Sequence, residues 1–263
     1  MIGGITWLAP FNDVGQVSRA IDYGCGTGVA TVQLATILPS AIVYGVDISP
    51  IPEAVQKLAP SNAIWAQGNI LDNDPTQTIE GNTLSREILR PQSLDYVFGR
   101  MLFLGINDWA RYFSTVSQAM KSGSIIEHQD LDWKFYRVGT SECLSDNWEW
   151  HLAVGAATEK SGLSLYAGSG AVSHMENAGL EVIRVETFEF SFVPSKKTPN
   201  SQSMARYVQS KLMPQYPELL RKMLEPLGIK GEELGRLTED CLRDLNSEEG
   251  IHQKYTVTIA KKP

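Results

Sequence analysis

The stretch Arg19-Ala20-Ile21-Asp22-Tyr23-Gly24-Cys25-Gly26-Thr27-Gly28 decides the fold of this 263-residue chain. Apolar residues run up to an acid, three alternating glycines follow, and residues 29–38 then predict a helix. A strand, a glycine turn and a helix in this order bring bare backbone up to a ligand in α/β sheets. Glycine is needed because the turn requires a positive φ and because a Cβ would collide with the ligand.

The spacing of the glycines and the acids at two strand ends indicate the ligand. The motif is G-x-G-x-G, whereas the dinucleotide fingerprint is G-x-G-x-x-G with a pyrophosphate at the helix N-terminus. Asp22 fits badly beside a pyrophosphate and well beside a cationic amino group. The next predicted strand, residues 41–47, ends in Asp47, which is placed to accept hydrogen bonds from two ribose hydroxyls. A ribose and an ammonium group without a pyrophosphate indicate S-adenosylmethionine as the cofactor.

Two segments in register resemble the first two motifs of the class I S-adenosylmethionine-dependent methyltransferases, namely residues 22–28 (DYGCGTG) and 44–49 (YGVDIS). The resemblance implies an α/β fold with a Rossmann-like, seven-stranded, mostly parallel sheet. It further implies an antiparallel last strand, helices on both faces and helical lid insertions. The alternative is a glycine-rich turn in an unrelated α/β protein.

The resemblance also implies which residues hold the cofactor. After the third strand, predicted at residues 63–67, the family places a polar residue that meets the adenine amino group, and then a residue that packs on the ring. Here these are Asn69 and Ile70, although the family usually has an acid at the first position. The full set of expected cofactor-binding residues is Asp22, Gly24, Cys25, Gly26, Gly28, Asp47, Ile48, Asn69, Ile70 and Arg100.

Segments further along the chain resemble one family within this class. Residues 99–102 (GRML) and 107–109 (NDW), followed by residues 127–132 (EHQDLD), resemble the fungal LaeA-like methyltransferases, which are associated with secondary metabolism. The match covers residues 8–133, and residues 170–193 more loosely. It therefore implies a role in fungal secondary metabolism.

Residues 1–18 have space for only a turn or two of helix, where most members of the class place helices that cap the cofactor. We expect the cap to be reduced, or to come from an insertion or from another chain, as in a homodimer. The alternative is a disordered or trimmed start.

Two later stretches, residues 133–168 and 194–250, are predicted to form substrate-lid insertions within a single domain spanning residues 1–263. Two alternating strands, predicted at residues 180–192 and 255–260, are expected to complete the sheet as an antiparallel hairpin.

The first insertion is rich in aromatic residues. A helix predicted at residues 145–161 places Trp148, Leu152 and Gly155 on one face, at i, i+4 and i+7 spacing. The alternative is that these side chains simply pack the helix onto the sheet. The expected substrate-binding residues are Met101, Trp133, Trp148 and Tyr166.

Methyl transfer from a sulfonium is an in-line displacement with a good leaving group, so the protein mainly aligns the nucleophile and excludes water. His128, near the end of the fifth predicted strand (residues 124–130), is the candidate general base. The alternative is a structural histidine held by backbone groups beneath the cofactor. His151 is the second candidate base, or else a surface residue.

Arg100 follows the fourth predicted strand, residues 93–99. It is expected to pair with the cofactor carboxylate or with an acidic substrate; the alternative is a pair with Asp130 or Asp132. These two acids and Glu127 lack partners at the spacing of a metal site, so we expect no metal.

Charge and composition argue against nucleic-acid-binding, membrane-spanning and secreted proteins. The net charge of −7 argues against non-specific nucleic-acid binding, which depends on basic patches. No apolar run approaches the ~20 residues of a membrane span, and the start of the chain lacks the pattern of a secretory signal. The three cysteines lie far apart and show no disulfide or metal pattern, so a reducing, cytoplasmic location is expected.

Three functions remain open at this point. The first is a methyltransferase acting on an O, N or S atom of a small molecule in secondary metabolism. The second is a regulatory or protein-directed methyltransferase that acts through a partner. The third is a protein that retains the cofactor but no longer methylates.

Overall fold

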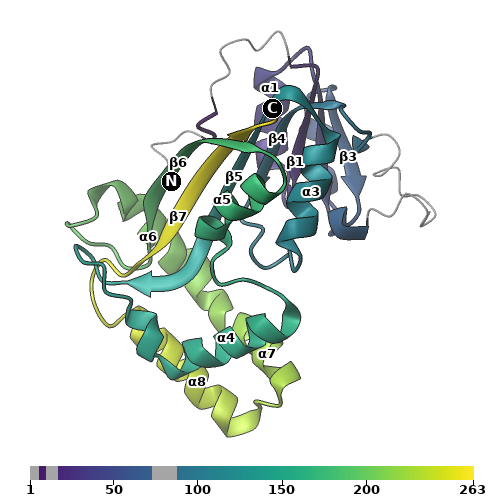
Figure 1. Cartoon of the computed structure of the whole chain (residues 1–263). Coiled ribbons are helices and arrows are strands. Elements are labelled where there is room, and N and C mark those ends of the chain that lie inside the picture. Colours follow the sequence, from purple (N-terminus) through teal and green to yellow (C-terminus); the bar gives the residue numbers. More distant parts are fainter. Residues whose placement is uncertain (1–5, 10–16, 73–87) are drawn as a thin grey trace. The chain divides into compact units, whose positions relative to one another are not determined.

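The computed structural model describes residues 6–9, 17–72 and 88–263 (Figure 1). Its seven strands form one sheet in the order β3-β2-β1-β4-β5-β7-β6. The strands are β1 (Arg19–Tyr23), β2 (Ile42–Asp47), β3 (Ala63–Gln67), β4 (Leu94–Arg100), β5 (Met120–Tyr136), β6 (Glu181–Ser191) and β7 (His252–Lys261).

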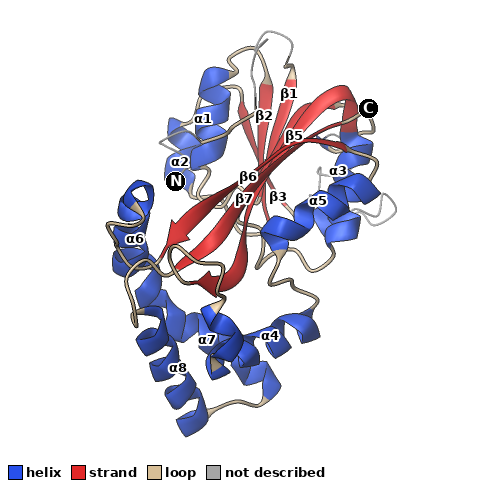
Figure 2. Ribbon diagram, turned by 60° about the vertical axis from the view of Figure 1, so that its left-hand side comes forward, coloured by secondary structure: helices blue, strands red, loops and turns tan. Residues whose placement is uncertain are grey.

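The sheet is parallel from β3 to β5, and the last strands are antiparallel. Figure 2 shows α1 (Val29–Ile37) and α2 (Glu53–Leu58) on one face of the sheet, and α3 (Trp109–Ala119) and α5 (Ala167–Asn177) on the other. The predicted fold is therefore confirmed. Because β1 and β2 are paired in register, with Tyr23 opposite Val46, the ends of the two sequence motifs lie side by side.

The chain forms two compact units. Among the described residues, the sheet unit comprises those within 6–130, 170–186 and 257–263, and the helical unit comprises residues 131–169 and 187–256. Strands β5, β6 and β7 have residues in both units. Both predicted insertions, residues 133–168 and 194–250, lie entirely within the helical unit. Their role as substrate lids and the single domain expected from the sequence stay predictions.

In the sheet unit, the segment before β1 is anchored on β5 by a buried carboxylate. The backbone N–H groups of Leu8 and Ala9 donate hydrogen bonds to the Glu127 carboxylate, at 2.8 Å and 2.6 Å. The side-chain amide of Gln129 donates to the carbonyl of Thr6 at 2.9 Å. These bonds satisfy an acid that lies within the sheet, where an unpaired charge would be costly.

Strand β5 is much longer than the predicted strand of residues 124–130. Lys121, Ser122 and Gly123, which precede the predicted strand, already lie within β5. Gly123 adopts a φ of 83°, and the pairing of β4 with β5 shifts register nearby. The irregularity keeps these polar residues in the strand, because a bulge absorbs an extra residue without ending the pairing.

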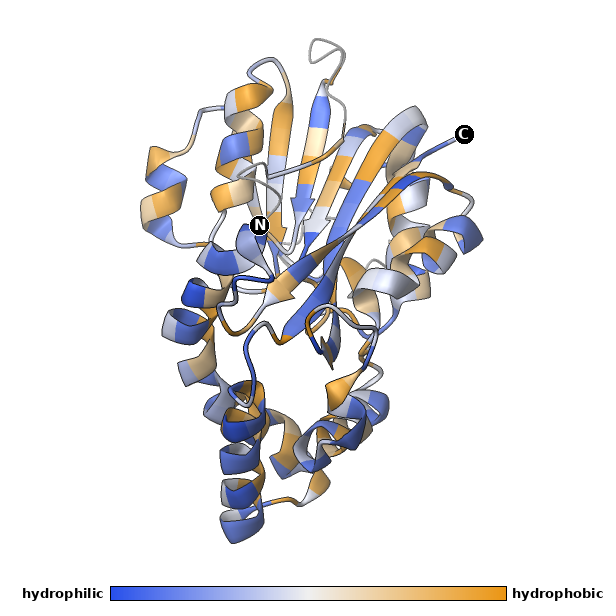
Figure 3. Ribbon diagram, turned by 90° about the vertical axis from the view of Figure 1, so that its left-hand side faces the viewer, coloured by the Kyte–Doolittle hydropathy of each residue, from blue (hydrophilic) through white to orange (hydrophobic). Residues whose placement is uncertain are grey.

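The helical unit packs α4 (Glu149–Ser161), α7 (Tyr216–Leu224) and α8 (Gly231–Leu245) against one another. An additional helix, α6 (Gln202–Tyr207), precedes α7 and α8 in the second insertion. Figure 3 shows hydrophobic and hydrophilic residues alternating along these helices, as expected for helices with one buried stripe.

The face predicted from residues 148, 152 and 155 is not the face that α4 buries. The buried stripe consists of Trp150, Val154 and Ala157, whereas Leu152 is 57% exposed. Trp148 precedes the helix as its N-cap residue, with extended backbone, so it does not follow the helical period. Both stripes have i, i+4, i+7 spacing, and the one that begins inside the helix is the one that is buried.

Within the described residues, no helix has the length and apolar character needed to cross a membrane.

Candidate functional site

The glycine turn after β1 has the conformation that the sequence predicts. Gly24, Gly26 and Gly28 have φ values of 60°, 53° and 77°. A Cβ on Gly24 would lie 2.2 Å from the Leu102 side chain, and one on Gly28 would lie 2.7 Å from the Trp65 ring. Two of these glycines are therefore fixed by packing as well as by backbone conformation.

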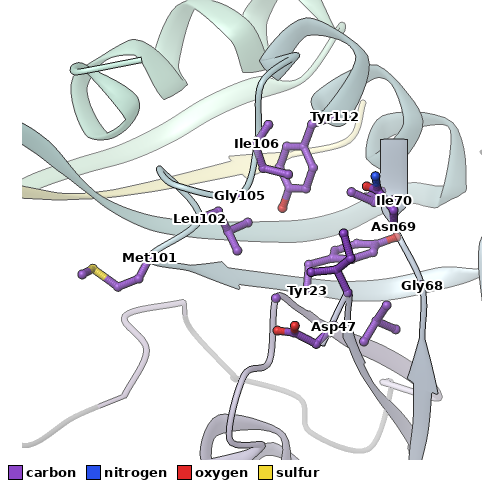
Figure 4. Close-up of a pocket in the computed structure, with 13 residues that line it drawn as sticks. Tyr23, Asp47, Gly68, Asn69, Ile70, Met101, Leu102, Gly105, Ile106 and Tyr112 are labelled. Atoms are coloured by element: carbon purple, nitrogen blue, oxygen red, sulfur yellow. The ribbon is translucent and has the colours of Figure 1, made fainter. Parts of the chain in front are cut away.

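A pocket with a volume of about 190 Å³ lies at the carboxyl ends of β1, β2 and β3, entirely within the sheet unit (Figure 4). Six of the predicted site residues line it: Gly24, Asp47, Ile48, Asn69, Ile70 and Met101. The other lining residues were not predicted: Tyr23, Val46, Gly68, Leu102, Gly105, Ile106 and Tyr112. The carboxyl edge of parallel strands is where ligands bind in open α/β sheets.

Asp47 connects the two sequence motifs. Its Oδ2 accepts a hydrogen bond from the Gly26 N–H at 2.8 Å, and its Oδ1 accepts one from the Ser49 N–H, also at 2.8 Å. The carboxylate therefore holds the glycine turn against the end of β2. Each carboxylate oxygen can accept a second hydrogen bond, so Asp47 keeps acceptor capacity toward the pocket.

Asp22 is buried beneath the glycine turn and is not among the residues that line the pocket. Its Oδ2 accepts a hydrogen bond from the Thr31 hydroxyl at 2.6 Å. Burial raises the pKa of Asp22 from 3.8 to about 7, although the Thr31 hydrogen bond and the Arg100 charge lower it in part. The carboxyl is therefore close to half-ionised at neutral pH, and a nearby cation would favour the ionised form.

The residues after β3 form one wall of the pocket (Figure 4). Ile70 is buried, and Asn69 accepts a hydrogen bond on Oδ1 from the Leu71 N–H at 2.9 Å. Ile48, after β2, is 66% exposed although it is apolar. An exposed isoleucine at a pocket is suited to packing against a planar apolar ring.

The loop after β4 forms the opposite wall. Met101 has a φ of 57°, which is uncommon for a residue other than glycine. The conformation is held because the Met101 N–H donates to the Gln129 carbonyl at 2.9 Å and the Leu102 N–H donates to Asp130 Oδ2 at 2.8 Å. Strain of this kind concentrates at functional sites.

Arg100, just before this loop, does not line the pocket, and its guanidinium lies 5.9 Å from the centre of the Phe98 ring. The two acids considered as its partners accept backbone hydrogen bonds instead, Asp130 from Leu102 and Asp132 from Ser169. Among the described residues, Arg100 makes no salt bridge, so its expected pairing with a ligand carboxylate stays a prediction.

Neither candidate base is exposed. Burial lowers the pKa of His128 to about 3, and its Nε2 lies 3.6 Å from Asp130 Oδ2. His151, in the helical unit, has Nε2 2.7 Å from the Trp133 carbonyl, and burial lowers its pKa as well. Both are neutral and weakly basic at pH 7, so their role as general bases stays a prediction.

The remaining predicted substrate residues belong to the helical unit. Trp133 is buried, and its backbone carbonyl lies 2.7 Å from His151 Nε2. Tyr166 is 49% exposed, and the centre of its ring lies 5.7 Å from the Lys134 amino group. Contact of Trp133, Trp148 or Tyr166 with a substrate stays a prediction.

Two other glycine-turn residues, Cys25 and Gly26, also lie outside the pocket lining, as does Gly28. Burial raises the pKa of the Cys25 thiol to about 12, so this cysteine is not a nucleophile at neutral pH. Across the part of the chain that the structure describes, no three His, Cys, Asp or Glu side chains are grouped to hold a metal ion.

Sequence comparison identifies related proteins. A family model described as a methyltransferase domain matches residues 5–185. The chain is 22% identical over 244 residues to the secondary metabolism regulator laeA of Coprinopsis cinerea, covering 88% of this chain and 56% of that protein. It is 23% identical over 121 residues to methyltransferase str2 of Strobilurus tenacellus, covering 46% and 38% of the two chains. The chain thus spans about half the length of the curated relatives it matches.

Solved structures share the fold. Phosphoethanolamine N-methyltransferase 2 of Haemonchus contortus in complex with S-adenosyl-L-methionine has a TM-score of 0.55 and 17% identity, covering 94% of this chain and 49% of that one. The cyclase SpnF has a TM-score of 0.53 and 16% identity, covering 94% and 75%. Because the family model matches more than half of the chain, and its match contains both sequence motifs, the protein belongs to the methyltransferase domain family.

Proposed function

We propose that this protein is an S-adenosylmethionine-dependent methyltransferase that transfers a methyl group to an O, N or S atom of a small molecule, in fungal secondary metabolism. The observation that carries the proposal is the Asp47 carboxylate, which joins the two motifs through Gly26 and Ser49 and lines the pocket. The curated relatives are a secondary metabolism regulator and a methyltransferase, which supports this setting.

The described residues fit the cofactor. Asp47 retains acceptor capacity for ribose hydroxyls, and Ile48 and Ile70 offer apolar surface for a planar ring. Asp22 is a buried acid behind the turn, whose ionised form an ammonium group would stabilise. When bound, the cofactor supplies an electrophilic methyl group on a sulfonium. The residues of this chain would bind and orient it and keep water away from the reacting atoms.

The proposed methyl transfer does not require a general base from this chain. The pKa of His128 is about 3, so the site offers little general-base catalysis from this residue. Alignment of the acceptor with the methyl group can contribute about 7–11 kcal/mol to lowering the barrier. We therefore expect an acceptor that is nucleophilic without deprotonation, or is activated by groups other than the two histidines.

The experiment is calorimetric titration of the purified protein with S-adenosylhomocysteine, followed by incubation of the protein with labelled S-adenosylmethionine and fungal metabolite extracts. Asp47→Ala should weaken binding by about 10–100-fold, the range expected for hydrogen bonds to a charged group. Glu53→Gln on the exposed surface of α2 is the matched control and should bind as the parent does. Absence of binding by the parent, or equal affinity of Asp47→Ala in a folded state, would refute the proposal.

A regulatory, protein-directed methyltransferase is a second candidate, because the relative from Coprinopsis cinerea is described as a regulator. In the same incubation, label recovered on a protein rather than on a metabolite would support this candidate. Binding without transfer to either class would instead support a protein that retains the cofactor but does not methylate. The cytoplasmic location and the homodimer expected from the sequence also remain proposals.

A further inference from the structure

Two tyrosine hydroxyls at the pocket are buried without a hydrogen-bond partner. Tyr23 lies on β1 and is 2% exposed, and Tyr112 lies on α3 and is 0% exposed. Their rings meet edge to face with centroids 6.0 Å apart. Both residues line the pocket, and Figure 4 shows Tyr112 extending into it with the hydroxyl foremost. Neither hydroxyl has a partner among the described residues.

Buried tyrosines elsewhere in the described chain have partners. The Tyr96 hydroxyl lies 3.5 Å from Glu127 Oε2, and the Tyr216 hydroxyl has a hydrogen-bonding interaction with Trp133. Buried polar groups are almost always paired, because an unpaired one loses its hydrogen bonds to water without replacement. The two exceptions among the buried tyrosines described are therefore located at the one pocket where a ligand is expected.

The space around Tyr112 is shaped for its hydroxyl. A Cβ on Gly99 would lie 2.8 Å from the Tyr112 oxygen and 3.1 Å from the Leu102 side chain. The absence of a side chain at Gly99 thus leaves room for the Tyr112 hydroxyl at the pocket. Burial raises the pKa of both phenols well above 10, so each remains a neutral hydrogen-bond donor at physiological pH.

A ligand that supplies hydrogen-bond acceptors at this end of the pocket would pair both hydroxyls. Ile70 and Ile106 provide apolar surface in the same pocket, which suits a planar ring whose edge carries acceptors. A purine has ring nitrogens that only accept hydrogen bonds, and the proposed cofactor contains adenine. Asp47 in the same pocket is the proposed ribose contact, so the ring and the sugar would share the pocket.

We infer that the Tyr23 and Tyr112 hydroxyls donate hydrogen bonds to ring nitrogens of the adenine, and thereby set the specificity of the pocket for the purine. This inference rests on the proposed function. It assigns two binding residues in addition to Asn69 and Ile70, and it explains why tyrosine rather than phenylalanine occupies both positions.

The first test compares Tyr23→Phe, Tyr112→Phe and the control Tyr96→Phe, a buried tyrosine outside the pocket. Each pocket variant should bind S-adenosylhomocysteine about tenfold more weakly than the parent in calorimetry, whereas the control should bind equally. Without ligand, the two pocket variants should unfold in urea at the same concentration as the parent or at a higher one, because each removes an unpaired polar group. A role limited to folding would produce the opposite pattern, namely lower stability with unchanged affinity.

The second test identifies the ligand atoms with S-adenosylhomocysteine analogues in which one ring nitrogen is replaced by carbon. The parent should bind an analogue that lacks the contacted nitrogen about tenfold more weakly than it binds S-adenosylhomocysteine. The matching phenylalanine variant should bind the analogue and S-adenosylhomocysteine equally tightly. If the parent binds the ligand but the variants bind equally well, or if no analogue shows this coupling, the inference is wrong while the proposed function stands. If the parent does not bind at all, both are wrong.

Discussion

Replacement of Asp22 by asparagine should stabilise the protein without ligand and weaken its binding of the proposed cofactor. The carboxyl is 2% exposed, and its one hydrogen bond from a side chain comes from Thr31. Burial outweighs this bond and the attraction of Arg100, so the pKa of Asp22 is about 7 in place of 3.8. Asparagine keeps a carbonyl oxygen that can accept from Thr31 but never carries the charge.

The direction in which the free energy of unfolding changes with pH follows from proton binding by Asp22. Between about pH 4 and pH 7 the folded protein holds a proton on Asp22 that the unfolded chain releases, so the free energy of unfolding falls as pH rises through this window. At ~1.4 kcal/mol per pH unit, a rise of the pKa from 3.8 to about 7 corresponds to about 4 kcal/mol at pH 8. His128, with a pKa of about 3, acts in the opposite direction, but it is present in both proteins and cancels in their difference.

The measurement is urea unfolding of the parent and of Asp22→Asn at pH 5, 6, 7 and 8. The advantage of the variant should be about 1.7 kcal/mol at pH 5 and grow to about 4 kcal/mol at pH 8. Asp95→Asn is the matched control. Burial alone would raise the pKa of Asp95, but hydrogen bonds from Lys121 and Ser18 lower it, so this variant should lose stability above pH 4. A pH-independent difference between Asp22→Asn and the parent would refute the reasoning.

Two further pairs of substitutions test the packing. Gly28→Ala should lower the free energy of unfolding in urea by about 2–3 kcal/mol, because φ is 77° and the new Cβ would meet the Trp65 ring. Gly26→Ala, where φ is 53° and the space is open, should lower it by about 1 kcal/mol. Equal losses would show that the Trp65 contact has no effect. Trp150→Ala should cost about 3–5 kcal/mol, whereas Leu152→Ala on the exposed side of α4 should stay within about 0.5 kcal/mol, and a reversed order would contradict the buried face described for this helix.

The sequence was sufficient for features that depend on local pattern. The acid at the end of a strand, the glycine turn and the following helix are adjacent in the chain, so their geometry follows from backbone preferences alone. The position of Asp47 beside the turn follows from the parallel pairing of two consecutive strands, which is the usual arrangement. The seven-stranded, mostly parallel sheet followed from family resemblance rather than from these patterns.

The sequence was insufficient where two distant segments compete for the same space. Tyr23 lies inside the first motif, and strand alternation places it on the face opposite Asp22, but nothing local indicates that its hydroxyl lacks a partner. Tyr112, whose ring meets that of Tyr23, comes from α3 and has the spacing of an ordinary core residue beside Trp109 and Phe113. In α4, similarly, two apolar stripes were available, and only packing selects the one that is buried.

The glycines of the turn are required for a second reason that the sequence does not reveal. The sequence argument requires Gly24 and Gly28 so that a ligand can approach the backbone, yet a Cβ at either position would also collide with Leu102 or Trp65. Trp65 similarly restricts Gly45 on β2, where a Cβ would lie 2.6 Å from its ring. Internal packing therefore demands the same residues as ligand binding does. Loss of cofactor affinity after a glycine substitution would consequently not separate the two causes, whereas the tyrosine hydroxyls, which support no described contact within the protein, do separate them.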